Sequence, residues 1–142
     1  MARAADEVGL DLLQLHGHEP PQALADLPRR ALKAVGVGDG FVPEDALRYE
    51  GRAAGILLDT RTEAGPAGGS GQSFDWTRAR AVREKASFLM LAGGLSPENV
   101  HLALSAVRPD GVDVSSGVEA APGRKDADKV RAFMAAVREA ER

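Results

Sequence analysis

Hydrophobic and polar residues alternate along the chain in blocks, with short apolar runs separated by longer amphipathic stretches. The apolar runs are rich in Leu, Val, Ile and Ala, and runs of this length and composition are typical of buried strands. We therefore expect strands at residues 10–15, 32–37, 54–59, 88–93 and 111–116.

The stretches between these runs predict helices at 20–27, 43–49, 75–86, 96–107 and 125–141. In the last of them, apolar side chains recur at the i, i+3, i+4 and i+7 positions of one helical face; they are Val130, Phe133, Met134 and Val137. Strands that alternate with helices indicate βα units and a parallel sheet. We expect one α/β domain over residues 1–142.

The number of strands limits the architecture. Five strands fall short of the eight that close a βα barrel, which typically needs about 200–250 residues. The first residues, ARAADEVG, also read as the tail of a helix that leads into the first strand, so the start of the chain looks cut. An open five-stranded parallel sheet remains the alternative to part of a barrel.

Charge and composition exclude several classes of function. The net charge is −3 and the basic residues are not clustered, which gives no indication of nucleic-acid binding. The absence of cysteine excludes disulfides and thiolate metal sites. No apolar run approaches the roughly 20 residues needed to cross a bilayer, and MARAADEVG has no signal-peptide core. We expect a cytoplasmic protein.

Candidate binding chemistry follows the last two predicted strands, at the end where α/β proteins place their sites. Gly93 and Gly94 come after the fourth strand, and Ser96 then marks a helix start. The fifth strand ends in Ser115, Ser116 and Gly117. Main-chain amides and hydroxyls in such loops bind phosphate. We predict a phosphate site, with two ordinary turns as the alternative.

Two carboxylates belong to the same edge of the expected sheet. Asp59 closes the apolar run ILLD, where a partly desolvated carboxyl can act as a general acid or base; a loop-capping aspartate is the alternative. Asp113 falls inside the fifth run, which is unusual for a charge in a buried strand unless it faces a polar pocket. A solvated edge-strand aspartate is the simpler reading.

The glycine-rich stretch at 65–76 lacks the Lys-Ser/Thr ending of a nucleotide-binding loop. It favours a mobile active-site loop, with a plain surface loop as the alternative. His16 and His18 lie too close together on a loop to chelate a metal well, and His101 brings no third ligand. We expect no metal, and a structural or substrate-contacting role for His16.

Five segments together resemble the phosphoribosylanthranilate isomerase family, and they occur in the family's order. The segments are LLQLHG at 12–17, LLDT at 57–60, GGSGQSFDW at 68–76, LAGGLSPENV at 91–100, and GVDVSSGVE with PGRKD at 111–126. The family fold is a (β/α)8 TIM barrel. The resemblance therefore implies parallel βα repeats, with about five units corresponding to strands four to eight of an incomplete barrel.

The resemblance also implies a reaction and its residues. The family carries out an Amadori rearrangement of N-(5′-phosphoribosyl)anthranilate to 1-(2-carboxyphenylamino)-1-deoxyribulose 5-phosphate in tryptophan biosynthesis, without a cofactor. Asp59 matches the general acid, and Gln14, His16 and Asp113 match substrate-contacting positions. Gly93, Gly94, Ser115, Ser116 and Gly117 fall in the phosphate loops.

The chain departs from the family in lacking the cysteine that serves as general base. We therefore expect the C-terminal part of the isomerase without its first three βα units, nearly inactive alone. Self-association or complementation by an N-terminal segment is expected to cover its exposed sheet edges.

Other functions remain open. A phosphate-binding half-barrel or pseudoenzyme would keep the phosphate loops without turnover, and a purely structural half-barrel would bind nothing. Ribulose-phosphate epimerase and the isomerase of histidine biosynthesis are rival phosphate-binding barrels, against which the segment at 68–76 argues.

Overall fold

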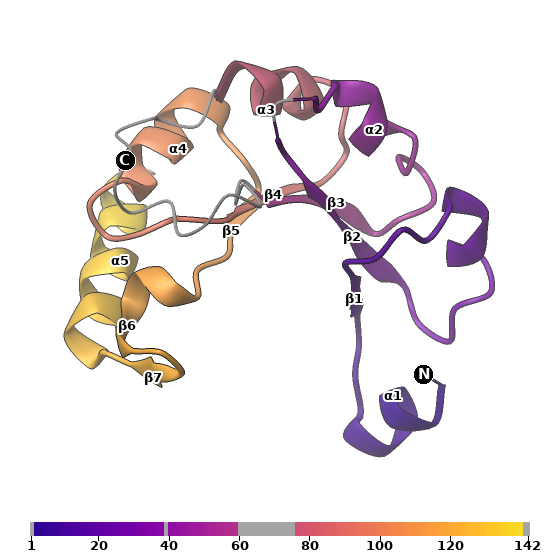
Figure 1. Ribbon diagram of the computed structural model, residues 1–142, viewed down its shortest axis with the longest axis horizontal. Helices are drawn as coiled ribbons and strands as arrows, with labels where there is room; N and C mark the ends of the chain where they lie inside the picture. Colours follow the sequence, from indigo (N-terminus) through magenta and orange to yellow (C-terminus); the bar gives the residue numbers. More distant parts are fainter. Residues whose placement is uncertain (1, 39, 60–75, 141–142) are drawn as a thin grey trace.

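A five-stranded parallel sheet forms the centre of the protein, in a computed structural model that describes residues 2–38, 40–59 and 76–140 (Figure 1). The strands lie side by side in chain order, and every neighbouring pair is parallel. They are β1 (Leu13–Leu15), β2 (Ala31–Gly36), β3 (Gly55–Asp59), β4 (Leu89–Ala92) and β5 (Gly111–Val112). The predicted parallel α/β fold is confirmed.

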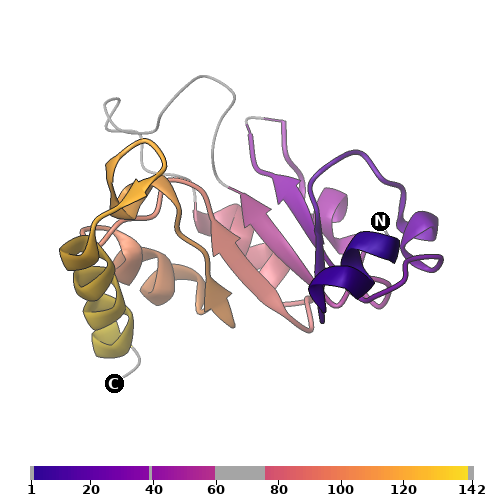
Figure 2. The ribbon, with the colours of Figure 1, turned by 90° about the horizontal axis from the view of Figure 1, so that it is seen from below.

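The helices that pack against this sheet in the described part of the chain cover one of its faces. Figure 1 shows the covering helices outside the curve of the strands, and in Figure 2 they lie behind the central strands. The covering helices are α2 (Pro43–Leu47), α3 (Trp76–Arg83) and α4 (Val100–Val107). Helices α1 (Ala2–Val8) and α5 (Ala127–Ala140) lie at the two ends of the arc. No described helix is long and apolar enough to span a membrane.

Two 3-10 helices and a two-stranded hairpin complete the described chain. The 3-10 helices are η1 (Pro21–Leu24) after β1 and η2 (Ser116–Val118) after β5. The hairpin is the antiparallel pair of β6 (Glu119–Ala121) and β7 (Arg124–Lys125), which leads into α5. Gly123 turns this hairpin at a φ of 76°, a backbone angle that favours glycine.

Several element boundaries differ from the sequence prediction. The helix expected at 20–27 is only the four-residue η1, because Pro28 disfavours the helical conformation in the residue before it. The strand expected at 111–116 ends at Val112, since the chain then turns into η2. The hairpin of β6 and β7 was not predicted. Helix α4 begins at Val100, after a turn at 97–99.

The two faces of the sheet follow the two-residue period of the strands. Ile56, Leu58, Leu89 and Leu91 pack against the covering helices in the main core. Alternate residues form a smaller apolar cluster on the face that no helix covers, namely Ala34, Leu57, Met90 and Ala92. We call this second face the open face. A side chain two residues before or after Leu57 or Ala92 in the same strand therefore points to the open face.

Candidate functional site

Asp59 is the last residue of β3, and its side chain is buried on the open face. It lies two residues after Leu57 and pairs in register with Gly36 on one side and Ala92 on the other. Only 5% of Asp59 is exposed. The small neighbours leave room beside its carboxyl, and a buried carboxyl needs polar partners to offset its desolvation. A reactive or binding group at this position is chemically reasonable.

His16 is a polar partner of Asp59 that follows β1, the edge strand two strands away from β3. Its Nε2 lies 3.6 Å from Asp59 Oδ2, and about half of the imidazole is exposed. His16 comes directly after β1, and Gln14 two residues earlier is paired with Leu32. The alternation of β1 therefore directs Gln14 and His16 to the same face. The structure brings His16 to Asp59, although 43 residues separate them in the sequence.

A pocket lies beyond the carboxyl ends of β4 and β5, and it contains the residues predicted to bind phosphate. Residues 92–95 and 113–117 line it. Gly93 and Gly94 have φ values of 85° and 65°, which L side chains rarely adopt, so the turn after β4 depends on glycine. Both predicted phosphate segments thus face one pocket.

Asn99 holds the first of these loops in shape. Its Nδ2 donates to the carbonyl of Gly94 at 2.9 Å, and its Oδ1 accepts from the main-chain amide of Ser96 at 2.8 Å. The Ser96 hydroxyl accepts from the amide of Glu98 at 3.3 Å, so Ser96 caps the turn that precedes α4. Asn99 was not among the predicted site residues. Its position three residues after a serine, a spacing typical of capped turns, was the available signal.

Gly117 brings the second loop against the first. A Cβ at this position would lie 1.8 Å from the carbonyl oxygen of Leu95 and 3.1 Å from Ser96 Cα. Both are main-chain atoms, so no side-chain rotation could make space. Only glycine allows the two loops to approach this closely.

Asp113 lines the same pocket but is not buried in a strand. It follows β5 directly, is exposed, and donates its main-chain amide to the carbonyl of Leu91 at 2.8 Å. The strand expected over this residue ends one residue earlier, so Asp113 lies beyond β5 rather than within it. The side chain needs no buried partner in this position.

Charged side chains brace the loop after β5. Lys125 Nζ donates to the carbonyl of Ser115 at 2.8 Å and to Glu119 Oε1 at 3.0 Å. The hydrogen bond from Lys125 holds the pKa of Glu119 below its usual value. These contacts join the hairpin of β6 and β7 to the pocket. The sequence did not predict them, because the hairpin itself was not predicted.

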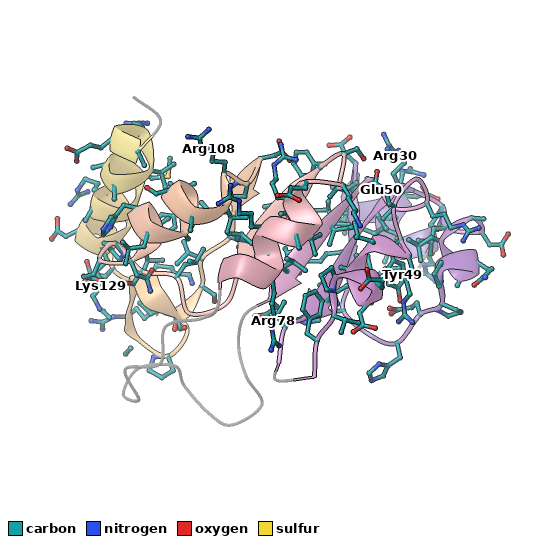
Figure 3. The ribbon with its side chains drawn as sticks, turned by 90° about the horizontal axis from the view of Figure 1, so that it is seen from above. Arg30, Tyr49, Glu50, Arg78, Arg108 and Lys129 are labelled. Atoms are coloured by element: carbon teal, nitrogen blue, oxygen red, sulfur yellow. The ribbon has the colours of Figure 1, made fainter. Side chains whose placement is uncertain are left out.

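Arg78 of α3 reaches the carboxyl edge of the sheet from the helix layer. Its Nη1 donates to the carbonyl of Gly38, in the segment after β2, at 3.0 Å. Figure 3 shows Arg78 at this edge, whereas Glu50 and Arg108 lie at the opposite one.

The remaining candidates are two histidines and the glycine-rich stretch. His18 is exposed and His101 is exposed on α4. Across residues 2–38, 40–59 and 76–140, no group of three or more His, Asp or Glu side chains could hold a metal ion. The glycine-rich stretch at 65–76 lies outside the described residues apart from Trp76, where α3 begins.

Comparison with known proteins identifies the family. A profile described as N-(5'phosphoribosyl)anthranilate (PRA) isomerase matches residues 1–136. The chain belongs to this family. The N-(5′-phosphoribosyl)anthranilate isomerase of Thermotoga maritima is 48% identical over 132 residues, which cover 92% of this chain and 62% of the relative. The Pseudomonas putida (strain GB-1) isomerase is 50% identical over 94% of this chain and 63% of the relative.

Solved structures of PRA isomerases agree with the fold. The Thermotoga maritima crystal structure matches with a TM-score of 0.85 and 43% identity, over 96% of this chain and 66% of that one. A PRA isomerase in complex with reduced 1-(o-carboxyphenylamino)-1-deoxyribulose 5-phosphate matches with a TM-score of 0.81 and 40% identity, over 96% and 64%. The chain spans slightly less than two thirds of the length of the curated relatives described above.

Proposed function

We propose that this chain serves in the Amadori rearrangement of N-(5′-phosphoribosyl)anthranilate to 1-(2-carboxyphenylamino)-1-deoxyribulose 5-phosphate, in tryptophan biosynthesis. The observation that carries the proposal is the buried Asp59 at the end of β3, on the same sheet edge as the pocket between the β4 and β5 loops. A sugar-phosphate substrate requires an anion site for its phosphate and a proton donor for its ring oxygen. In βα barrels such groups come from the carboxyl ends of several strands.

The proposed division of roles follows the chemistry of the substrate. Main-chain amides and hydroxyls of the two loops hold the phosphate, at Gly93, Gly94, Ser115, Ser116 and Gly117. Asp59 gives its proton to the ribose ring oxygen as the C1′–O bond breaks, which opens the ring and leaves a protonated imine. A base then takes the C2′ proton, and the resulting enolamine tautomerises to the ketone. Gln14, His16 and Asp113 contact the substrate.

The protons of this reaction balance without a cofactor. Asp59 loses one proton on ring opening, and the base gains one from C2′, so the two groups exchange protons with the substrate without oxidation or reduction of the enzyme. The family resemblance assigns the base to a cysteine, and this sequence contains none. We therefore propose that these 142 residues alone turn over the substrate very slowly or not at all.

The proposed architecture is a single partial βα-barrel domain over 1–142, in which β1 to β5 correspond to strands four to eight. Each of β1 and β5 pairs with one neighbour only in the described sheet, and the apolar cluster of Ala34, Leu57, Met90 and Ala92 lies on the open face. Unpaired edges and apolar faces favour association. Self-association, or an added segment that supplies the first three strands, would pair the two edge strands and cover the open face. We propose that the enzyme is cytoplasmic.

The test is loss of the fluorescence of phosphoribosylanthranilate, measured with the chain alone and with a separately supplied segment carrying the first three strands of a PRA isomerase. We expect turnover only in the mixture, and we expect Asp59→Asn to abolish it. Inorganic phosphate binding is measured in parallel. Phosphate binding without turnover in any mixture would instead indicate a phosphate-binding module. Turnover by the chain alone would refute the need for the cysteine.

A further inference from the structure

Lys125 occupies an unusual position relative to the pocket between β4 and β5. It belongs to β7, outside both loops, yet its Nζ contacts Ser115 twice: the carbonyl oxygen at 2.8 Å and Oγ at 3.4 Å. Ser115 lines the pocket, whereas Lys125 does not. Lys125 therefore contacts a residue that lines the pocket without lining the pocket itself.

We propose that Lys125 is a positioning residue for the phosphate loop at 115–117, which fixes Ser115 without touching the phosphate itself. The proposal rests on the phosphate role given to this pocket under the proposed function. An ammonium group can only donate hydrogen bonds. When the Ser115 carbonyl and Oγ both accept from this ammonium group, the Ser115 hydroxyl proton must point elsewhere, and it is free to serve the pocket that Ser115 lines.

Glu119 completes this arrangement and neutralises the lysine. Glu119 Oε1 accepts from Lys125 Nζ at 3.0 Å, and Oε2 accepts from the amide of Gly123 at 3.3 Å in the hairpin turn. The carboxylate thus ties the lysine to the hairpin and orients its remaining protons toward Ser115. Lys125 is half exposed, so without this partner its long side chain would sample many rotamers.

The close contact of Gly117 with Leu95 restrains the other end of the loop that contains Ser115. Residue 117 sits against the carbonyl of Leu95 with no space for a methyl group. A loop held at one end by Lys125 and at the other by Leu95 has little freedom between them. Preorganised donors bind an anion with less ordering cost than donors on a loose loop.

Positioning and simple charge attraction predict opposite effects for Glu119→Gln. This change removes a negative charge near the pocket, so charge attraction alone would tighten phosphate binding. If Lys125 acts by position, the same change frees its side chain and weakens binding. The sign of the effect therefore separates the two explanations.

The experiment measures binding of inorganic phosphate to the full chain by phosphorus NMR at constant ionic strength. We expect Lys125→Met to weaken phosphate binding by up to about tenfold, because the ordering of Ser115 that the Lys125 hydrogen bond now supplies would have to come from phosphate binding. Glu119→Gln should weaken it by a smaller factor. Lys125→Arg should retain most of the affinity. Arg124→Met is the matched control: it removes the same charge from the neighbouring exposed residue of β7, and it should bind as the wild type does.

A second readout does not depend on phosphate. Amide hydrogen exchange at 115–117 should speed up in Lys125→Met and not in Arg124→Met. Equal weakening by both variants, or tighter binding in Glu119→Gln, would overturn the positioning role while leaving the phosphate site intact. A wild-type chain that binds no phosphate would refute the phosphate site and this role together.

Discussion

Replacing Gly117 with alanine tests the contact that joins the two loops of the pocket. The added Cβ would meet the Leu95 carbonyl oxygen at 1.8 Å, whereas ordinary contacts begin at 3.4 Å. The loops must therefore separate by about 1.6 Å, the difference between these two distances. The atoms in the way belong to the main chain of Leu95 and Ser96, so rotation of a side chain cannot relieve the strain.

The cost of this separation follows from typical values for overpacking. Forcing a methyl group into a filled space costs about 1–3 kcal/mol, which for a domain of this size lowers the melting temperature by roughly 3–9 °C. Hydrogen bonds to an anion require donors at about 2.7–3.1 Å. A shift of this size therefore removes one loop from the phosphate, and we expect affinity for inorganic phosphate to fall at least about tenfold.

Thermal denaturation by circular dichroism and phosphate titration by phosphorus NMR provide the two readouts. Gly36→Ala is the matched control, since a Cβ at residue 36 of β2 meets nothing within 4 Å. It should leave phosphate affinity unchanged and stability equal or slightly raised. If Gly117→Ala melts and binds phosphate as the control does, the loops do not approach as described, and the two-loop pocket is refuted.

Three further changes test the charged groups. Lys33 is 2% exposed, and it donates to the Gly17 carbonyl at 2.6 Å and to Glu19 at 2.9 Å. Lys33→Met should therefore lower the free energy of unfolding, measured in urea, by about 2–3 kcal/mol. This loss is smaller than the usual cost of breaking a buried ion pair, because about a third of the Glu19 side chain is exposed. The hydrogen bond from Lys33 lowers the pKa of Glu19 from its usual value, so this stabilisation is present above the unfolded-state pKa of Glu19 and is lost as pH falls through the lower folded-state pKa. Lys33→Met should therefore flatten the acid limb of a stability–pH curve. Asp126 Oδ1 accepts hydrogen bonds from two main-chain amides at the start of α5, and these bonds lower the pKa of Asp126. Asp126→Ala should lower the melting temperature more than Asp126→Asn, because asparagine keeps an oxygen that can cap the helix. Equal effects of the two changes would contradict the capping role.

The strands and the two faces of the sheet could be predicted from the sequence because burial imposes a local pattern. The run Gly55–Asp59 is buried along its whole length, and strands buried on both faces read as continuous apolar runs. The same pattern predicted that Asp59 would lie at the end of its strand. The glycines at 93 and 94 were equally visible, because a turn with positive φ after a strand selects that residue.

The contacts that shape the site were not predictable, because they join distant parts of the chain. Nothing local to His16 indicates that it meets Asp59, and nothing local to Lys125 indicates that it reaches back to Ser115. Lys33 did carry a signal, since a lysine inside an apolar strand run needs a buried partner. Its partners at Gly17 and Glu19, however, come from the segment after β1 and meet it only once the strands pair.

In the proposed function, phosphate binding and proton transfer depend on different parts of this fold, and this difference is open to measurement. The described residues that line the pocket proposed for phosphate come from the adjacent segments at the ends of β4 and β5, which contact each other directly at Gly117 and Leu95. Asp59 lies one strand away, and its neighbour His16 comes from β1, at the far edge of the sheet. Loosening the β1 edge should therefore disturb the pairing of His16 with Asp59 and leave phosphate affinity intact. Because Lys33 holds the segment after His16 from the helix side, Lys33→Met is the change that should separate the two properties.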